Sequence, residues 1–227
     1  MRKDKKLFLE EVWQQVEPIY KKMKEHPFVV ELAKGVLPIA CFTHYLQQDM
    51  LYLRIDAEVF NLLADRWEKE NSNVEEREER ARFFRDMATD NIATELWMEK
   101  QFLKEFSITK ATELGPAIKN YTTFLQQQVQ TNTIAVATAA LLPCFWLYAL
   151  LTREILKIAV QPNPYQLWID TYQGEEYLTY TDTFLTTVES LAKKATSTQK
   201  GEMKQAIVRA AQLELAFLEE SITICHS

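Results

Sequence analysis

Glycine is scarce in this chain, and its scarcity limits the folds that the chain can adopt. Only four of the 227 residues are glycine, whereas average usage of about 7% would give roughly sixteen. Hairpin turns and phosphate-binding loops depend on glycine, because glycine adopts backbone conformations that are strained for other residues. The sequence therefore favours helices, and we expect an all-α fold.

Apolar and aromatic residues recur at helical spacing between the few prolines and glycines. After Pro38, which suits the first turn of a helix, one face would contain Phe42, Tyr45, Leu46, Asp49, Tyr52, Leu53 and Val59. Further helices are expected over residues 74–106, 116–131, 133–159, 163–173, 176–195 and 198–223. The last would be capped by Ser197 or Thr198. No repeat, linker or strand pattern divides the chain, so we expect a single helical domain over residues 1–227.

The charge balance excludes several classes of partner. The chain has 26 Lys and Arg against 32 Asp and Glu, a formal net charge of −6, which is unsuited to nucleic acid or to an anionic membrane. Residues 134–151 are nearly all apolar, but Pro143 interrupts them, so we expect a buried helix rather than a membrane span. Three cysteines and no signal peptide predict a cytoplasmic protein.

Metal chemistry is not indicated by the sequence. There are three histidines, and none forms the Glu-x-x-His pair of a di-iron bundle. No cysteine pair has the spacing of a zinc site. We therefore expect neither a metal nor another cofactor.

Cys144 lies in an apolar run, where a cysteine is usually a buried core thiol. Tyr148 follows four residues later, which places both side chains on one helix face. A tyrosine hydroxyl there can support a thiolate by hydrogen bonding. The sequence is therefore compatible with two interpretations of Cys144, a buried core thiol and a reactive thiol.

Two acidic residues occupy positions that look buried. Asp49 shares a helical stripe with Tyr52, and Glu214 lies in the apolar run 213–218 of the last helix. Carboxylates are almost never fully buried without a partner. Each acid therefore belongs to a structural salt bridge, has a functional partner, or lies on a face that the spacing does not reveal.

The order and spacing of several motifs resemble the TenA, or thiaminase II, family over nearly the whole chain. The motifs are His26-Pro27-Phe28, Gly35, Leu37, Phe42, Tyr45, Gln48-Asp49 and Tyr52-Leu53; Asn120-Tyr121-Thr122, Pro143-Cys144, Trp146 and Tyr148; and Trp168-Ile169-Asp170-Thr171-Tyr172, Glu214 and Phe217. The resemblance implies a haem-oxygenase-like multi-helix bundle, commonly a homotetramer, which acts on a small pyrimidine or thiamin. It implies hydrolysis in thiamin salvage. Family members convert 4-amino-5-aminomethyl-2-methylpyrimidine to 4-amino-5-hydroxymethyl-2-methylpyrimidine and ammonia, and they cleave thiamin to pyrimidine and thiazole.

The resemblance also implies roles for individual residues. Cys144 falls at the nucleophile, Glu214 at the acid that assists the leaving group, and Tyr52 at a hydroxyl that supports the cysteine. Asp49 falls at the carboxylate that holds the aminopyrimidine. The remaining pocket positions are Tyr121, Tyr148 and Tyr172.

Two positions depart from the family pattern, and two other functions stay open. Many members have histidine where this chain has Glu99, and tryptophan where it has Leu218, which affects the expected pocket shape. The main alternative is a non-catalytic pyrimidine- or thiamin-binding protein of the same fold, with a regulatory role. A haem-binding enzyme is a second alternative, suggested by His26.

Overall fold

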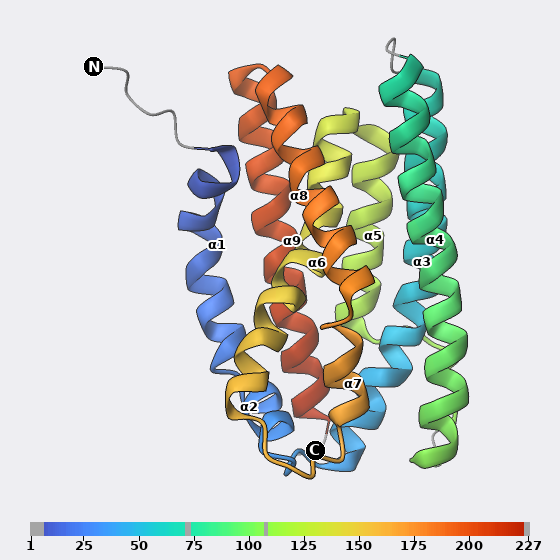
Figure 1. The fold of residues 1–227 in the computed structure, drawn as a ribbon, viewed down its shortest axis with the longest axis vertical. Coiled ribbons are helices and arrows are strands. Elements are labelled where there is room, and N and C mark those ends of the chain that lie inside the picture. The colour runs from blue at the N-terminus through green and yellow to red at the C-terminus, as the bar shows by residue number, and fades with distance from the viewer. Residues whose placement is uncertain (1–6, 71–73, 107–108, 225–227) are drawn as a thin grey trace. The chain divides into compact units, whose positions relative to one another are not determined.

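Every regular element in the described residues is a helix (Figure 1). The computed structural model describes residues 7–70, 74–106 and 109–224. The helices are α1 (Phe8–Lys24), α2 (Pro27–Ala33), α3 (Ile39–Glu70), α4 (Val74–Glu105), α5 (Pro116–Thr131), α6 (Ile134–Ile158), α7 (Gln166–Thr171), α8 (Glu175–Lys194) and α9 (Ser197–Thr223). The expected all-α class is confirmed, and the expected helix ranges differ from the observed ones by a few residues.

The chain divides into two compact units. One, the α6 unit, comprises Met1–Leu37 and Thr138–Leu215; the other, the α3 unit, comprises Pro38–Ala137 and Ala216–Ser227. Helices α6 and α9 contribute residues to both units. That residues 1–227 form a single domain stays a prediction.

In the α3 unit, α3 and α4 pack side by side along their length (Figure 1). Phe60 of α3 stacks on Phe84 of α4, with ring centroids 6.0 Å apart. Arg85 of α4 donates to Asp65 and Glu68 of α3 at 2.8 and 2.9 Å. These contacts hold two long helices together by an apolar core and a charged rim.

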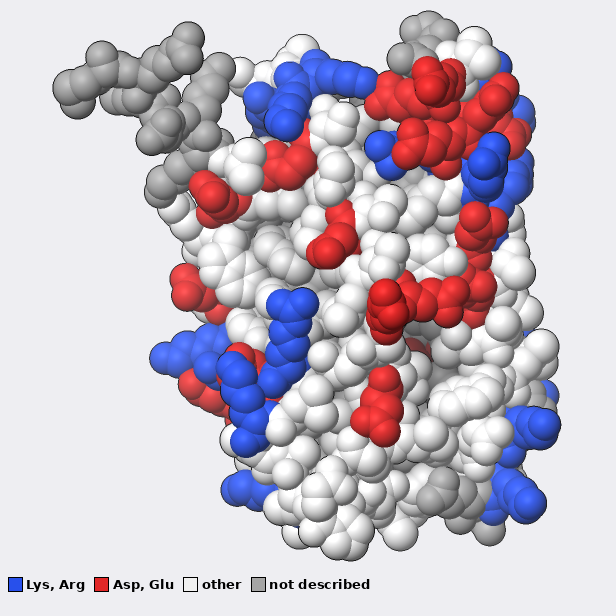
Figure 2. Space-filling view, in the orientation of Figure 1, with Lys and Arg blue, Asp and Glu red and all other residues white. Residues whose placement is uncertain are grey.

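The charge run at the start of α4 is largely solvated, as the sequence predicts. Glu75, Glu78, Glu79 and Arg82 are exposed. Figure 2 shows acidic side chains gathered where α4 begins. These charged side chains are therefore in contact with solvent and do not form part of the core.

Both ends of α5 are fixed by side chains of the α3 unit. At its start, Gln48 accepts from the Gly115 N–H at 2.7 Å, and Glu220 accepts from the Ala117 N–H at 2.7 Å. At its end, Arg66 donates to the carbonyl oxygens of Val129 and Asn132 at 2.6 and 2.7 Å. These bonds satisfy backbone groups that helix ends leave unpaired, and they fix the position of the tyrosine at 121.

In the α6 unit, Asn163 joins the end of α2 to the start of α7. Its Nδ2 atom donates to the carbonyl oxygens of Leu32 and Ala33, each at 3.0 Å. Its Oδ1 atom accepts from the Tyr165 N–H at 2.8 Å. Gly35, just after α2, has φ +67°, a conformation in which glycine is favoured.

Two expectations about individual helices can be compared with the structure. Thr196, rather than Ser197 or Thr198, caps α9: its Oγ1 accepts from the Gln199 N–H at 3.2 Å, and its own N–H donates to Gln199 Oε1 at 3.0 Å. This is a capping box, in which side chain and backbone satisfy each other. Among the described residues, α6 is the one helix apolar and long enough to cross a membrane, but 78% of its most apolar window is buried inside the protein. Burial of that extent is typical of a core helix.

Candidate functional site

A buried stripe of alternating tyrosine and aspartate runs along α3. Tyr45, Asp49, Tyr52 and Asp56 are all buried, and they follow one another at spacings of four, three and four residues. These spacings keep side chains on one face of a helix. The first three were expected there, whereas Asp56 was not.

The Asp49 carboxyl is buried, and no salt bridge to it is found in the part of the chain that the structure describes. Its Oδ2 atom has no hydrogen-bond partner, and burial raises the pKa of the carboxyl from 3.8 to about 7. A low-dielectric environment has this effect because it disfavours the charged form. Within the described residues, a structural ion pair therefore does not account for Asp49, and a ligand with an N–H donor would give it the partner that it lacks.

Asp56 is the buried acid that the sequence reasoning missed. Its Oδ2 atom accepts from Asn91 Nδ2 of α4 at 2.9 Å, and the Tyr52 hydroxyl is hydrogen-bonded to the same carboxyl. Burial raises the pKa of Asp56 to about 7, and the negative charge of Asp49 adds to the rise, while the bonds from Asn91 and Tyr52 oppose it. The continued spacing after Asp49 and Tyr52 was the signal that could have identified this residue.

Aromatic rings stack on both tyrosines of the stripe. Tyr52 and Tyr121 of α5 have ring centroids 5.3 Å apart and planes inclined by 27°. Tyr45 stacks on Phe217 of α9, with centroids 4.7 Å apart and an inclination of 19°. The structure thus brings together two predicted site residues, Tyr52 and Tyr121, and presents flat rings suited to a planar heterocycle.

In the α6 unit, Cys144 is a cysteine that is not part of a disulfide. It is partly exposed, although Leu142, Pro143 and Phe145 around it are buried. Tyr148 lies one helical turn later on α6. The thiol is therefore not enclosed by hydrocarbon on every side, which distinguishes it from an inert core cysteine.

The other two cysteines differ from Cys144. Cys41, near the start of α3, is fully buried and disulfide-bonded. Cys225 lies outside the described residues. Cys41 therefore has no thiolate to offer as a nucleophile.

An aromatic cluster formed by α6, α7 and α8 surrounds Tyr148. The Tyr148 ring lies 5.2 Å from that of Tyr172 and 6.3 Å from that of Trp168, measured between centroids. Tyr177 of α8 packs edge-on against Tyr172 at 5.3 Å, and its hydroxyl donates to the Cys144 carbonyl oxygen at 3.3 Å. The structure thus brings together the predicted pocket residues Tyr148 and Tyr172, and it adds Trp168 and Tyr177.

Glu214 lies on α9 in the α6 unit and is 2% exposed. It is therefore buried, as expected. Leu218, one turn later, is also buried. The side chain of Glu99, the other departure from the family pattern, lies outside the described residues.

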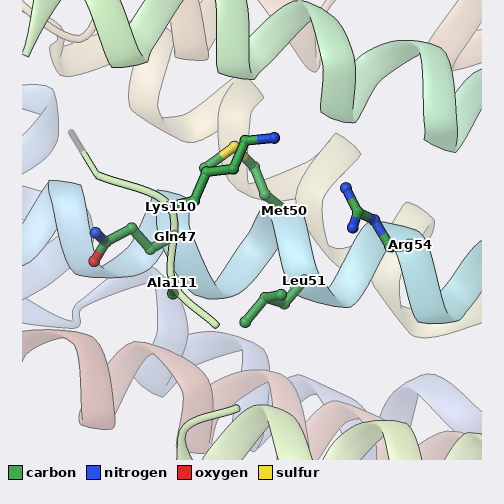
Figure 3. A pocket seen from close by; sticks show the side chains of 6 residues that line it. All are labelled: Gln47, Met50, Leu51, Arg54, Lys110 and Ala111. Carbon is green, nitrogen blue, oxygen red and sulfur yellow. The ribbon is translucent and has the colours of Figure 1, made fainter. Parts of the chain in front are cut away.

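Two pockets open elsewhere on the chain. One, on α3 and the segment before α5, has a volume of about 40 Å³ and is lined by Gln47, Met50, Leu51, Arg54, Lys110 and Ala111 (Figure 3). Small-molecule sites usually have volumes of about 300–1,000 Å³, so this one is too small for a substituted pyrimidine. The other, of about 410 Å³, lies at the start of α1 against α8 and α9. Neither pocket contains a predicted site residue.

The described residues contain no group of three or more His, Cys, Asp or Glu that could hold a metal ion. The Nδ1 atom of His26 accepts from the Phe28 N–H at 3.2 Å and so caps α2. This bond gives His26 a structural role at the start of α2.

Comparisons with known proteins identify the family to which this chain is similar. The sequence profile of the TENA/THI-4/PQQC family matches residues 13–223. An uncharacterized protein of Haemophilus influenzae is 30% identical over 227 residues, covering 95% of this chain and 99% of that protein. The aminopyrimidine aminohydrolase of Bacillus subtilis is 28% identical over 196 residues, covering 85% of this chain and 80% of the enzyme.

Solved structures show the same fold. A TenA homologue from P. horikoshii OT3 is 25% identical, with a TM-score of 0.79 over 96% of this chain and 99% of the other. A domain of unknown function from Shewanella denitrificans, described as having a heme oxygenase-like fold, is 12% identical, with a TM-score of 0.75 over 96% and 93% of the two chains. The expected haem-oxygenase-like helical bundle is therefore confirmed.

Proposed function

Because this chain belongs to the TENA/THI-4/PQQC family, we propose that it hydrolyses aminopyrimidines in thiamin salvage. One proposed reaction converts 4-amino-5-aminomethyl-2-methylpyrimidine to the corresponding hydroxymethylpyrimidine and ammonia. Cleavage of thiamin to pyrimidine and thiazole is the related second reaction. The similarity to an enzyme named aminopyrimidine aminohydrolase supports this choice.

One observation carries the proposal: Cys144 is a thiol outside any disulfide, and it is partly exposed although its neighbours in the chain are buried. A cysteine with only a packing role in the core would be expected to be fully buried. A nucleophile, in contrast, has to meet its substrate. Tyr148, four residues later on α6, provides an aromatic ring on the same helix face.

The proposed chemistry divides a difficult displacement into easier steps. The Cys144 thiolate forms a carbon–sulfur bond to the pyrimidine ring, and the ring expels the amine of its aminomethyl group. Glu214 protonates the departing nitrogen, which leaves as ammonia. Water then adds to the methylene carbon and gives a proton to the Glu214 carboxylate, and the carbon–sulfur bond breaks to restore the thiolate and the aromatic ring.

The remaining residues bind and orient the substrate. Asp49 accepts a hydrogen bond from the exocyclic amino group, which suits a buried acceptor that has an unpartnered oxygen. Tyr52 supports the thiol through its hydroxyl. Tyr121, Tyr148 and Tyr172 provide ring surfaces for the planar pyrimidine. None of these roles requires a metal or an organic cofactor.

The oligomeric state and the location of the protein are further proposals. The family resemblance predicts a homotetramer, which light scattering of the purified protein would measure. A cytoplasmic location also stays a prediction. The bonded state of Cys41 differs from the reduced thiols expected in that compartment, so a count of free thiols in freshly purified protein bears directly on it.

The proposal is tested with purified protein and a panel of substrates. The aminomethylpyrimidine, thiamin and an unrelated amine such as adenosine are incubated separately, and ammonia, hydroxymethylpyrimidine and thiazole are quantified. We expect turnover of the two pyrimidine substrates and none of adenosine. Tight binding of the pyrimidines without turnover would instead identify a non-catalytic binding protein.

A further inference from the structure

Asp56 is a buried acid for which the proposed chemistry has no role so far. It is 1% exposed, and its Oδ1 atom has no hydrogen-bond partner. A carboxyl at such a position usually pairs with a cation, because burying an unpaired charge is costly. Within the described residues, Asp56 instead bonds to the neutral side chains of Asn91 and Tyr52.

The environment of Asp56 is therefore unfavourable for stability alone. A second carboxyl, Asp49, lies two turns earlier on the same helix face and adds electrostatic repulsion. An apolar residue at position 56 would avoid both the desolvation and the repulsion. Buried ionisable side chains that carry such a cost in stability are concentrated at functional sites.

Tyr52 is the group through which Asp56 can act. Its ring is held by stacking on Tyr121, so the plane of the phenol is set. The hydroxyl proton has two favoured positions in that plane, and a hydrogen bond to the Asp56 carboxylate selects one of them. The oxygen lone pairs of Tyr52 are then presented to its other neighbours.

We propose that Asp56 is a positioning residue, which directs the Tyr52 O–H and thereby makes the Tyr52 oxygen a hydrogen-bond acceptor at the site. This inference rests on the proposed hydrolase function and deepens it. Asn91 supports the arrangement, because its bond to Oδ2 fixes the orientation of the carboxyl group. Asp56 itself touches no reacting atom.

The test is a kinetic double-mutant cycle with Asp56→Asn and Tyr52→Phe. Asp56→Asn keeps the shape of the side chain, and its amide oxygen can still accept a hydrogen bond from Asn91 Nδ2. It removes the charged carboxylate to which the Tyr52 hydroxyl is hydrogen-bonded. We expect Asp56→Asn to lower kcat by about tenfold or more with KM changed less than about threefold. In the Tyr52→Phe background, the same substitution should change kcat by less than about twofold, because the hydroxyl that it positions is gone.

A matched control separates this role from a structural one. Asp65→Asn makes the same substitution on α3 at an exposed residue paired with Arg85, and it should leave kcat unchanged. Thermal unfolding is measured for every variant, and Asp56→Asn should not unfold at a lower temperature than the wild type at pH 8. The positioning role alone would be overturned if Asp56→Asn lowered kcat only together with the unfolding temperature. It would also be overturned if Asp56→Asn lowered kcat by the same factor in the wild-type and Tyr52→Phe backgrounds. An inactive wild-type protein would overturn the proposed function and this role with it.

Discussion

The ring of Tyr52 stacks on that of Tyr121, with centroids 5.3 Å apart, although Tyr121 lies 69 residues further along the chain. The contact joins α3 to α5. It depends on the start of α5, which is held by Gln48 and Glu220 through the N–H groups of Gly115 and Ala117. If these two rings form part of the proposed pyrimidine site, the loss of one ring should weaken the binding of a planar substrate.

Replacing Tyr121 by Leu should weaken pyrimidine binding, whereas Tyr121→Phe should have little effect. Aromatic pairs contribute about 0.5–1.5 kcal/mol beyond their burial, so we expect KM to rise by about threefold to tenfold for Tyr121→Leu. Steady-state kinetics with the aminomethylpyrimidine would measure this. Equal KM values for the two variants would contradict the proposed role of the ring.

Glu214→Gln should lower kcat by a larger factor than it raises KM. An acid that protonates the leaving nitrogen acts in the transition state and contributes little to ground-state binding. General acid catalysis typically provides about 10²- to 10⁴-fold, so kcat should fall within that range. A change confined to KM would place Glu214 in substrate binding instead.

Asp49→Asn should weaken substrate binding as well as slow turnover. The substitution removes a charged acceptor from a buried position, and a hydrogen bond to a charged group contributes about 1.5–3 kcal/mol. Isothermal titration with the hydroxymethylpyrimidine product measures binding separately from chemistry. Unchanged product affinity would exclude Asp49 from the binding site.

The raised pKa values of Asp49 and Asp56, each about 7, predict a specific dependence of stability on pH. Because both carboxyls hold a proton more tightly in the folded than in the unfolded state, their contribution is greatest at low pH and is lost as pH rises through about 7. The unfolding temperature of Asp56→Asn relative to wild type should therefore be higher at pH 8 than at pH 5. Calorimetry at the two pH values measures the difference, and a constant difference would contradict the burial of a titrating carboxyl.

Gly115→Ala should destabilise the protein. A Cβ atom at this position would lie 2.1 Å from Glu220 Oε1, so Glu220 would have to move away from the start of α5. The hydrogen bond that Glu220 accepts from the Ala117 N–H would then be weakened, and loss of a helix N-terminal cap typically costs about 0.5–2 kcal/mol. Gly201→Ala is the control, because nothing lies within 4 Å of a Cβ atom added at this position. Since Gly201 is exposed in the first turns of α9, the substitution should raise the free energy of unfolding by about 0.5–1 kcal/mol. Similar effects of the two substitutions on denaturant unfolding would contradict this account.

The helices could be predicted from the sequence because their signal is local. Spacing of apolar residues and the positions of proline and glycine determined the ranges of α4, α5 and α6 to within about two residues. The predicted caps of α9, Ser197 and Thr198, were wrong, although the sequence pattern of Thr196 and Gln199 is that of a capping box. The signal for this cap is therefore local too.

The site could be predicted only in part, because its remaining features depend on contacts between distant segments. The spacing along α3 identified Asp49 and Tyr52, but the partner of Asp56 is Asn91, 35 residues away on another helix. Nothing near Asn91 in the sequence distinguishes it from a surface amide. Likewise, the packing of Trp168 and Tyr172 against Tyr148 follows from how α6 and α7 meet, which the sequence pattern does not specify.

The most direct test compares ammonia release from the aminomethylpyrimidine by wild-type, Cys144→Ser and Cys41→Ser proteins, each with its unfolding temperature. We expect Cys144→Ser to remain folded and to lose activity by orders of magnitude, because a serine hydroxyl is far less ionised than a thiol. Cys41→Ser removes a buried, disulfide-bonded residue, so it should affect unfolding and leave kcat close to the wild-type value. Retention of wild-type kcat by Cys144→Ser, or equal kcat losses in both variants, would contradict the assignment of Cys144 as the nucleophile.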